Sequence, residues 1–187
     1  MRERPRGRVE IELDGAPWRL VPADAVVRAS LLVGRELDRE TARALGRELR
    51  RAAALGVATR ALRHRDLSRR RLEERLAGRG AAAPARRDAL ETLERAGLVD
   101  DARTAAARSV ALAERGYGDE AIRFMLERDG FEAAVAAEAI AGLPAEAERA
   151  RNLLERSGGG VKGLRRLAAR GFGAGTLDDL SGFADEA

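Results

Sequence analysis

The sequence predicts a mainly α-helical fold: three tandem three-helix repeats in an elongated, curved array behind a small α+β N-terminal appendage. Three observations predict this class. Apolar residues keep the period of an α-helix from about residue 41 to the end of the chain. A ten-residue pattern that ends in glycine occurs three times. Alternation typical of strands is limited to residues 8–20.

The repeat is visible when Arg71–Gly80, Ala121–Gly130 and Lys162–Gly171 are aligned on their final glycines. One leucine position is shared by all three segments: Leu76, Leu126 and Leu167. We expect each final glycine in the left-handed conformation at a helix end, which glycine adopts without a Cβ clash. One unit of this kind leaves an apolar face exposed, so neighbouring units must stack to cover it.

Each repeat is predicted to contain one helix before the glycine-ended segment and one after it. The helices before the segments are expected near Ala52–Arg63, Ala102–Arg115 and Ala145–Arg156, and those after them near Ala85–Ala96, Ala133–Ala141 and Thr176–Ala184. The predicted boundaries are residues 1–48 for the appendage and 49–101, 102–143 and 144–187 for the repeats. The third repeat is degenerate, because Gly163 stands where the other two have an apolar residue.

The appendage is predicted to contain a β-hairpin and a short helix. Arg8–Leu13 alternates as a strand, and Asp14 with Gly15 is a turn pair. The alternation resumes at Trp18, and the short helix is expected to end near Gly34. An element of this size is stable only when it packs on the helices that come after it in the chain.

Three polar residues are predicted to cap helices. Asp38 precedes a helix that starts near Arg39, Ser68 precedes the first repeated segment, and Asp100 precedes the next helix. Serine and aspartate suit this position because their side-chain oxygens accept from the free N–H groups of the first turn. The second aspartate of the pair, Asp101, adds favourable negative charge at the same helix end.

The composition excludes several classes of protein. Of the 187 residues, 45% are hydrophobic and 35% are charged, which is too apolar for disorder and too charged for a membrane protein. No apolar run reaches the ~18 residues that span a bilayer. The basic N-terminus lacks the apolar core of a secretory signal, so we expect a cytoplasmic protein without a membrane partner. Cysteine is absent, which excludes disulfides and thiolate sites.

The positive charge is carried almost entirely by arginine, since Lys162 is the single lysine. The arginines are dense between residues 60 and 79, where they are Arg60, Arg63, Arg65, Arg69, Arg70, Arg71, Arg75 and Arg79. A GC-rich genome would produce the same bias. Two interpretations of this segment stay open: a solvated helix face, or a basic groove wall that contacts acidic protein surface or phosphate.

Each candidate site for catalysis or ligand binding lacks a residue that its chemistry requires. The glycines before Lys162 suggest a phosphate-binding loop, but Val161 precedes the lysine and Gly163 stands where serine or threonine should bind magnesium. His64 is the only histidine and has no cysteine partner for a metal. Ser68 has no base beside it in the sequence, so a helix cap is the better interpretation. We therefore predict no catalytic residue, no metal, no cofactor and no enzymatic activity.

Three motifs follow one another at regular spacing. They are Arg63–Leu76 (RHRDLSRRRLEERL), Gly97–Asp101 (GLVDD) and Arg115–Gly130 (RGYGDEAIRFMLERDG). In this order they resemble the RecX family of regulatory proteins, most clearly over residues 50–140. Two positions depart from the family pattern: Arg71 stands where an acidic residue is frequent, and Thr104 where an aromatic residue is usual.

The resemblance implies a regulator that has no chemistry of its own. Such a protein would lie in the groove of the RecA recombinase filament, inhibit its ATPase and strand-exchange activities, and act in homologous recombination, DNA repair and the SOS response. A monomer is expected, with weak binding to single- or double-stranded DNA. The residues expected to contact the filament or DNA are Arg63, Arg65, Arg69, Arg70, Arg115, Tyr117, Arg123, Arg128, Arg165, Arg166 and Arg170.

Two other functions remain open on the sequence. A stand-alone helical-repeat DNA-binding module would lose affinity steeply as salt rises, and it would not need RecA. A structural adaptor for another protein would use the same stacked helices, although the recurring arginines favour an acidic or phosphate-bearing partner.

Overall fold

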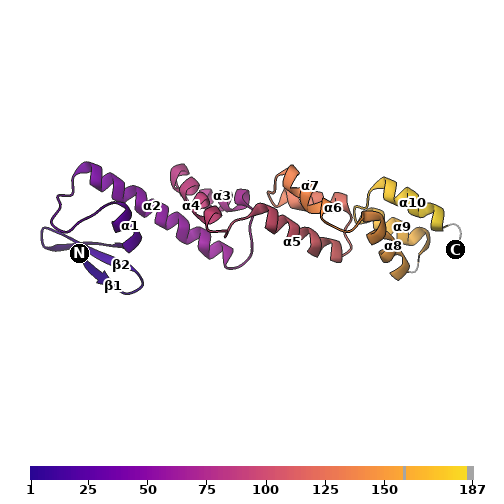
Figure 1. Ribbon diagram of the computed structural model, residues 1–187, viewed down its shortest axis with the longest axis horizontal. Helices are drawn as coiled ribbons and strands as arrows, with labels where there is room; N and C mark the ends of the chain where they lie inside the picture. Colours follow the sequence, from indigo (N-terminus) through magenta and orange to yellow (C-terminus); the bar gives the residue numbers. More distant parts are fainter. Residues whose placement is uncertain (158, 185–187) are drawn as a thin grey trace. The chain divides into compact units, whose positions relative to one another are not determined.

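The computed structural model describes residues 1–157 and 159–184, so position 158 and residues 185–187 of the predicted third repeat lie outside them. The described chain contains a three-stranded sheet and ten helices, which confirms the predicted mainly helical fold with a small N-terminal sheet (Figure 1). It divides into two compact units. Unit 1 is Met1–Arg65 with Leu72–Leu98, and unit 2 is Asp66–Arg71 with Val99–Ala187.

Unit 1 begins with an antiparallel sheet in the order β1-β2-β3. Its strands are β1 (Arg2–Arg4), β2 (Arg8–Leu13) and β3 (Ala16–Pro22). Strands β2 and β3 form the predicted hairpin, whose turn places Asp14 and Gly15 at φ 50° and 81°. Strand β1 was not predicted, because its three residues are all exposed and carry no apolar alternation.

One face of the sheet is buried. Val9 pairs with Val21, and both side chains lie in the core of the appendage with Ile11. Trp18 and Leu20 lie on the other side of the pleat and are 43% and 46% exposed. The alternation that begins at Trp18 therefore marks the outer face of β3 rather than the core.

Two helices complete the appendage. Helix α1 (Ala23–Arg28) ends earlier than the predicted position near Gly34, because Ser30 takes φ 52° and turns the chain. Helix α2 (Arg39–Leu62) is capped as predicted by Asp38, whose carboxylate accepts from the Thr41 backbone N–H at 2.7 Å.

Helix α2 is continuous across position 48, where the sequence predicted the end of the appendage. Its first half packs Leu45 into the appendage core. Its second half buries Ala54, Ala58 and Ala61 and packs on α4. One helix thus serves two cores, and the apolar pattern on its surface changes face between them without a chain break.

Helices α3 (Arg69–Gly78) and α4 (Ala83–Arg95) come next, and the division between the units falls within α3. Leu72 and Leu76 are one turn apart and fully buried, as is Leu90 of α4. Leucine at this spacing therefore forms the core of the first helix group.

Unit 2 contains two further groups of three helices, with the bounds α5 (Asp101–Glu114), α6 (Asp119–Arg128), α7 (Ala133–Ala141), α8 (Glu146–Arg156), α9 (Gly160–Ala169) and α10 (Ala174–Ala184). Each group has its own core, one around Leu126 and Phe131 and the other around Leu167 and Phe172. The predicted glycine turns are confirmed: Gly80, Gly130 and Gly171 have φ of 75°, 90° and 75°.

The described residues contain neither a membrane-spanning helix nor a cluster of potential metal ligands. No helix is both long and apolar enough to cross a bilayer. Within the same part of the chain, no group of three acidic, histidine or cysteine side chains is placed to hold a metal ion.

Candidate partner-binding surface

Inside unit 2, two equivalent joints connect the start of one helix with the end of the helix three elements further along the chain, and several predicted site residues lie at them. We call them the α3–α6 joint, where the start of α3 contacts the end of α6, and the α6–α9 joint, where the start of α6 contacts the end of α9. Both lie within unit 2 because residues 66–71 belong to it.

Ser68 closes the α3–α6 joint. Its hydroxyl accepts from the Arg71 backbone N–H at 3.2 Å, which confirms the predicted cap. The same hydroxyl donates to the Asp129 carbonyl at 2.6 Å, at the end of α6. Ser68 is 2% exposed, so this hydroxyl satisfies a buried acceptor as well as a helix end.

Further contacts surround Ser68. The backbone N–H of Arg69 donates to the Asp101 carboxylate at 2.8 Å, and the Arg71 guanidinium donates to the Arg128 carbonyl. Gly130 sits against the cap, since a Cβ there would lie 2.8 Å from the Ser68 hydroxyl. This glycine is required by close approach as well as by its positive φ.

The α6–α9 joint uses backbone groups instead of a hydroxyl. The Gly118 N–H donates to the Arg170 carbonyl at 2.9 Å, and the Glu120 N–H donates to the Gly171 carbonyl at 3.1 Å. A Cβ on Gly118 would lie 2.2 Å from the Gly171 carbonyl oxygen. The two helix ends therefore approach more closely here than any other residue type would permit.

Glu146, the first residue of α8, fastens this joint. One carboxylate oxygen accepts from the Asp119 N–H at 2.6 Å, and the other accepts from the Gly173 N–H at 3.1 Å and the Thr176 hydroxyl at 2.8 Å. Arg149 forms an ion pair with the Asp119 carboxylate. Burial raises the pKa of the Asp119 carboxyl above its usual range, Glu146 acts in the same direction, and Arg149 opposes them.

Three predicted site residues meet at this joint. The Arg115 and Arg170 guanidinium carbons lie 5.7 and 5.8 Å from the centroid of the Tyr117 ring, within cation–π range. Arg170 also donates from Nη1 to the Arg115 carbonyl at 2.6 Å. Arg170 is half-buried and helps to hold the joint, whereas Arg115 is exposed.

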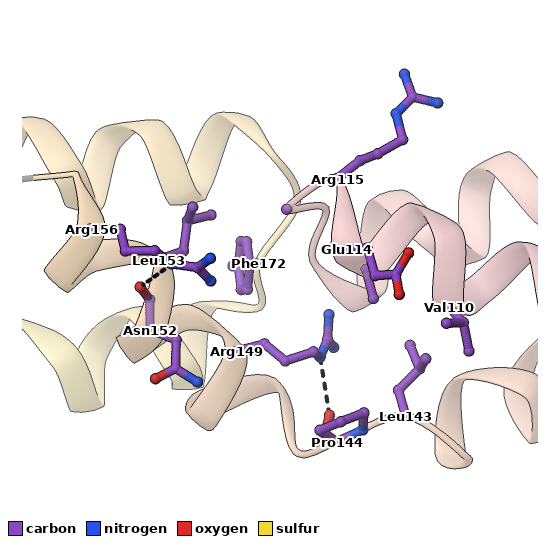
Figure 2. A pocket seen from close by; sticks show the side chains of 12 residues that line it. Val110, Glu114, Arg115, Leu143, Pro144, Arg149, Asn152, Leu153, Arg156 and Phe172 are labelled. Atoms are coloured by element: carbon purple, nitrogen blue, oxygen red, sulfur yellow. Dashed lines mark hydrogen bonds between the residues drawn. The ribbon is translucent and has the colours of Figure 1, made fainter.

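A cavity of about 520 Å³ lies beside this cluster, between the end of α5, the loop after α7, and α8. Its lining is Val110, Ala113, Glu114, Arg115, Gly116, Leu143, Pro144, Arg149, Asn152, Leu153, Arg156 and Phe172. Figure 2 shows Arg149 and Arg156 directed into the cavity and Arg115 directed away from it. The Arg149 guanidinium is already engaged in hydrogen bonds within the protein, since it donates to the Pro144 and Tyr117 carbonyls at 3.0 Å each. The cavity thus combines an apolar wall with a basic edge.

The other predicted arginines are not gathered into one cluster. Arg63 and Arg65 come after α2 in unit 1, and both are exposed. The remaining ones belong to unit 2, at the start of α3 (Arg69, Arg70), on α6 (Arg123, Arg128) and on α9 (Arg165, Arg166). All six are exposed except Arg69, which is half-buried, and Arg128 lies 5.9 Å from the exposed Phe124 ring.

Sequence reasoning missed Glu146, Arg149 and Gly118. A signal for the first was present, because Asp101 and Glu146 are acidic residues at the starts of equivalent helices, and each accepts from the start of the preceding repeated helix. Gly118 lies in the third motif, Arg115–Gly130, but nothing in that motif gives the reason for this glycine, which is its contact with a residue far along the chain.

Comparison with known proteins agrees with this fold. No protein-family model matches the sequence, and no curated protein matches it. Among solved structures, the crystal structure of regulatory protein RecX is similar with a TM-score of 0.80 and 19% identity, covering 96% of this chain and 95% of that one. RecX from Lactobacillus salivarius is similar with a TM-score of 0.63 and 17% identity, covering 74% of this chain and 98% of that one. The chain therefore has the RecX fold.

Proposed function

We propose that this protein is a RecX-type regulator that binds the RecA recombinase filament and inhibits its ATPase and strand-exchange activities. The observation that carries the proposal is the match to regulatory protein RecX over 96% of the chain at a TM-score of 0.80. The ordered motifs at Arg63–Leu76, Gly97–Asp101 and Arg115–Gly130 support it independently, because they resemble the same family in the sequence alone.

Regulation of this kind needs binding but no covalent step. A protein that binds one state of the filament more tightly than another shifts the filament toward the preferred state. Exposed arginines such as Arg123, Arg165 and Arg166 supply forked donors for carboxylates and phosphates, the charged groups of a protein–DNA filament. We propose these arginines as contacts, and the joint residues around Tyr117 as the support that holds α6 and α9 together.

The test is ATP hydrolysis by RecA on single-stranded DNA, measured while this protein is titrated up to stoichiometric amounts. Hydrolysis should fall. Unchanged hydrolysis at saturating protein would contradict the proposal. Adding excess single-stranded DNA separates the alternatives, because inhibition directed at RecA persists, whereas a protein that only sequesters DNA is titrated away.

A charge-reversal pair locates the contact. Arg165→Glu with Arg166→Glu should weaken inhibition by at least about thirtyfold, since each of the two lost charged contacts costs on the order of 1 kcal/mol or more. These two are better targets than Arg69 and Arg70, which have further interactions within the protein. Arg19→Glu with Arg87→Glu is the matched control, with the same charge change on unit 1. Equal loss in both pairs would show a general charge effect and would remove α9 from the contact.

A further inference from the structure

A row of four arginines lies along one face of the first half of α2, outside the three RecX-like motifs. Arg39, Arg43, Arg47 and Arg50 line a single shallow hollow together with Ala42 and Gly46. The residues are four, four and three positions apart, which keeps them on one side of the helix. Because a helix rises about 1.5 Å per residue, the row is about 16 Å long.

The row is opposite the packed side of the helix. Thr41 and Leu45 are buried against the appendage, while all four arginines are exposed. Glu48 lies on another face of the helix, about 100° around the helix axis from its neighbour Arg47. Its carboxylate pairs with Arg28 at 2.7 Å. The arginines therefore have no part in the core of unit 1.

No protein group neutralises the row within the described residues. No hydrogen bond, ion pair or ring contact engages its guanidinium groups in that part of the chain, and no acidic side chain lines the hollow. Like charges one turn apart on a helix repel each other and reduce stability. Four arginines at this spacing, without an ion-pair partner among the described residues, therefore reduce the stability of the folded protein, and a bound anion would relieve their repulsion.

The residues that line the hollow favour one class of anionic partner over the others. Among the described residues, Ala42 and Gly46 are the only ones besides arginine that line the hollow. None of these lining residues is a large apolar group of the kind that forms the centre of a protein–protein interface or inserts into a lipid surface. A nucleic-acid backbone needs no large apolar group for its binding, because it presents regularly spaced phosphates that arginine binds bidentately. One strand of B-DNA places about five phosphates along a length of about 16 Å.

We propose that the α2 arginine row, defined as Arg39, Arg43, Arg47 and Arg50, is a sequence-independent binding site for the phosphodiester backbone of nucleic acid. The site lies on the first half of α2 and acts without RecA. It is independent of the RecA-directed function, because a protein that fails to inhibit RecA can still bind nucleic acid through this row.

The experiment measures fluorescence anisotropy of labelled oligonucleotides of about 30 nucleotides, single-stranded and duplex, with the full chain and without RecA, between about 50 and 200 mM salt. Arg43→Gln with Arg47→Gln removes two phosphate contacts. The slope of log K against log salt should then become shallower by about 1.8 for duplex or about 1.4 for single strands. The two arms show which form the row prefers.

The loss of affinity should accordingly be about tenfold larger at 50 mM than at 200 mM salt. Arg19→Gln with Arg87→Gln is the control, with the same change in net charge elsewhere on unit 1, and its slope should match the wild type. Arg43→Lys with Arg47→Lys keeps the charge and should keep the slope. Helix content by circular dichroism should be equal in all variants, because the row makes no contact in the fold.

Three results would overturn the proposal. One is a wild-type protein that binds neither oligonucleotide at 50 mM salt. Another is a row variant whose slope is unchanged. The third is a control pair that loses as much slope as the row variant, which would show that net charge alone drives binding.

Discussion

The α3–α6 joint and the α6–α9 joint occupy the same place in successive helix groups, but different atoms close them. In the first, a buried serine hydroxyl reaches the carbonyl of Asp129 at 2.6 Å. In the second, the backbone N–H of Gly118 reaches the carbonyl of Arg170 at 2.9 Å. A hydroxyl is longer than a bare N–H, so the second pair of helix ends must approach more closely. Equivalent positions can therefore carry one hydrogen bond with opposite demands on side-chain size.

The largest expected effect comes from adding one methyl group to the closer joint. Gly118→Ala would place a Cβ 2.2 Å from the Gly171 carbonyl oxygen, so a backbone segment has to move. We expect unfolding of unit 2 to become easier by about 3 kcal/mol, the upper part of the range for overpacking. Urea unfolding followed by helix circular dichroism measures this.

Gly78→Ala is the matched control for that substitution. Gly78 lies in α3 with open space around its Cβ position and without positive φ. Alanine there should stabilise the protein by about 0.5–1 kcal/mol, because it restricts the unfolded chain and favours helix. The comparison between the joints fails if both substitutions shift the transition in the same direction by the same amount.

The next effect concerns the hydroxyl at the other joint. Ser68→Ala removes the cap of α3 and leaves the Asp129 carbonyl without its donor, which should cost about 2 kcal/mol. Asp100→Ala removes a cap and an exposed ion pair with Arg103, both inside the first turn of α5, and leaves no acceptor across a joint without its donor. It should cost about 1 kcal/mol, because an exposed ion pair adds little to the cap. Equal losses in urea unfolding would mean that the hydrogen bond across the joint contributes nothing.

The contrast between the joints also shows what a sequence can predict. The cap at Ser68, the glycine turn at Gly130 and the buried Leu126 depend on residues within about one helical turn, so local pattern was sufficient for them. The donor from Ser68 to Asp129 and the contact of Gly118 with Gly171 join residues far apart in the chain. Their partners are fixed by stacking, which no local pattern specifies.

The sequence predicted two helices where the structure has the single helix α2, for a related reason. The apolar face of α2 changes between Leu45 and Ala54 because the helix packs in two cores, and such a change in a helical apolar pattern looks like a break between two helices. The α2 arginine row was not among the predicted site residues. Its members are less dense along the chain than the arginines of residues 60–79, and the feature that unites them is their spacing on one exposed helix face.

The smallest expected effect is on the pH dependence of stability, to which Asp119 at the α6–α9 joint and the exposed helix cap Asp38 should contribute with opposite signs. Burial raises the pKa of Asp119 in the folded protein, so its contribution to stability is present below the unfolded value of about 3.9 and is lost as pH rises through the folded pKa. The hydrogen bond from Thr41 lowers the pKa of Asp38, so its contribution is present above about 3.9 and is lost as pH falls through the folded pKa.

Asparagine variants isolate each contribution, because asparagine keeps an acceptor oxygen and a good cap but does not titrate. As pH falls from 7 toward 3, the melting temperature of the wild type should rise relative to Asp119→Asn and fall relative to Asp38→Asn. The opposite signs make the pair a control for general acid effects on the fold. If both differences move in the same direction, the carboxylate at the α6–α9 joint is solvated like the one at the surface, and the close packing inferred from Gly118 does not exclude water from it.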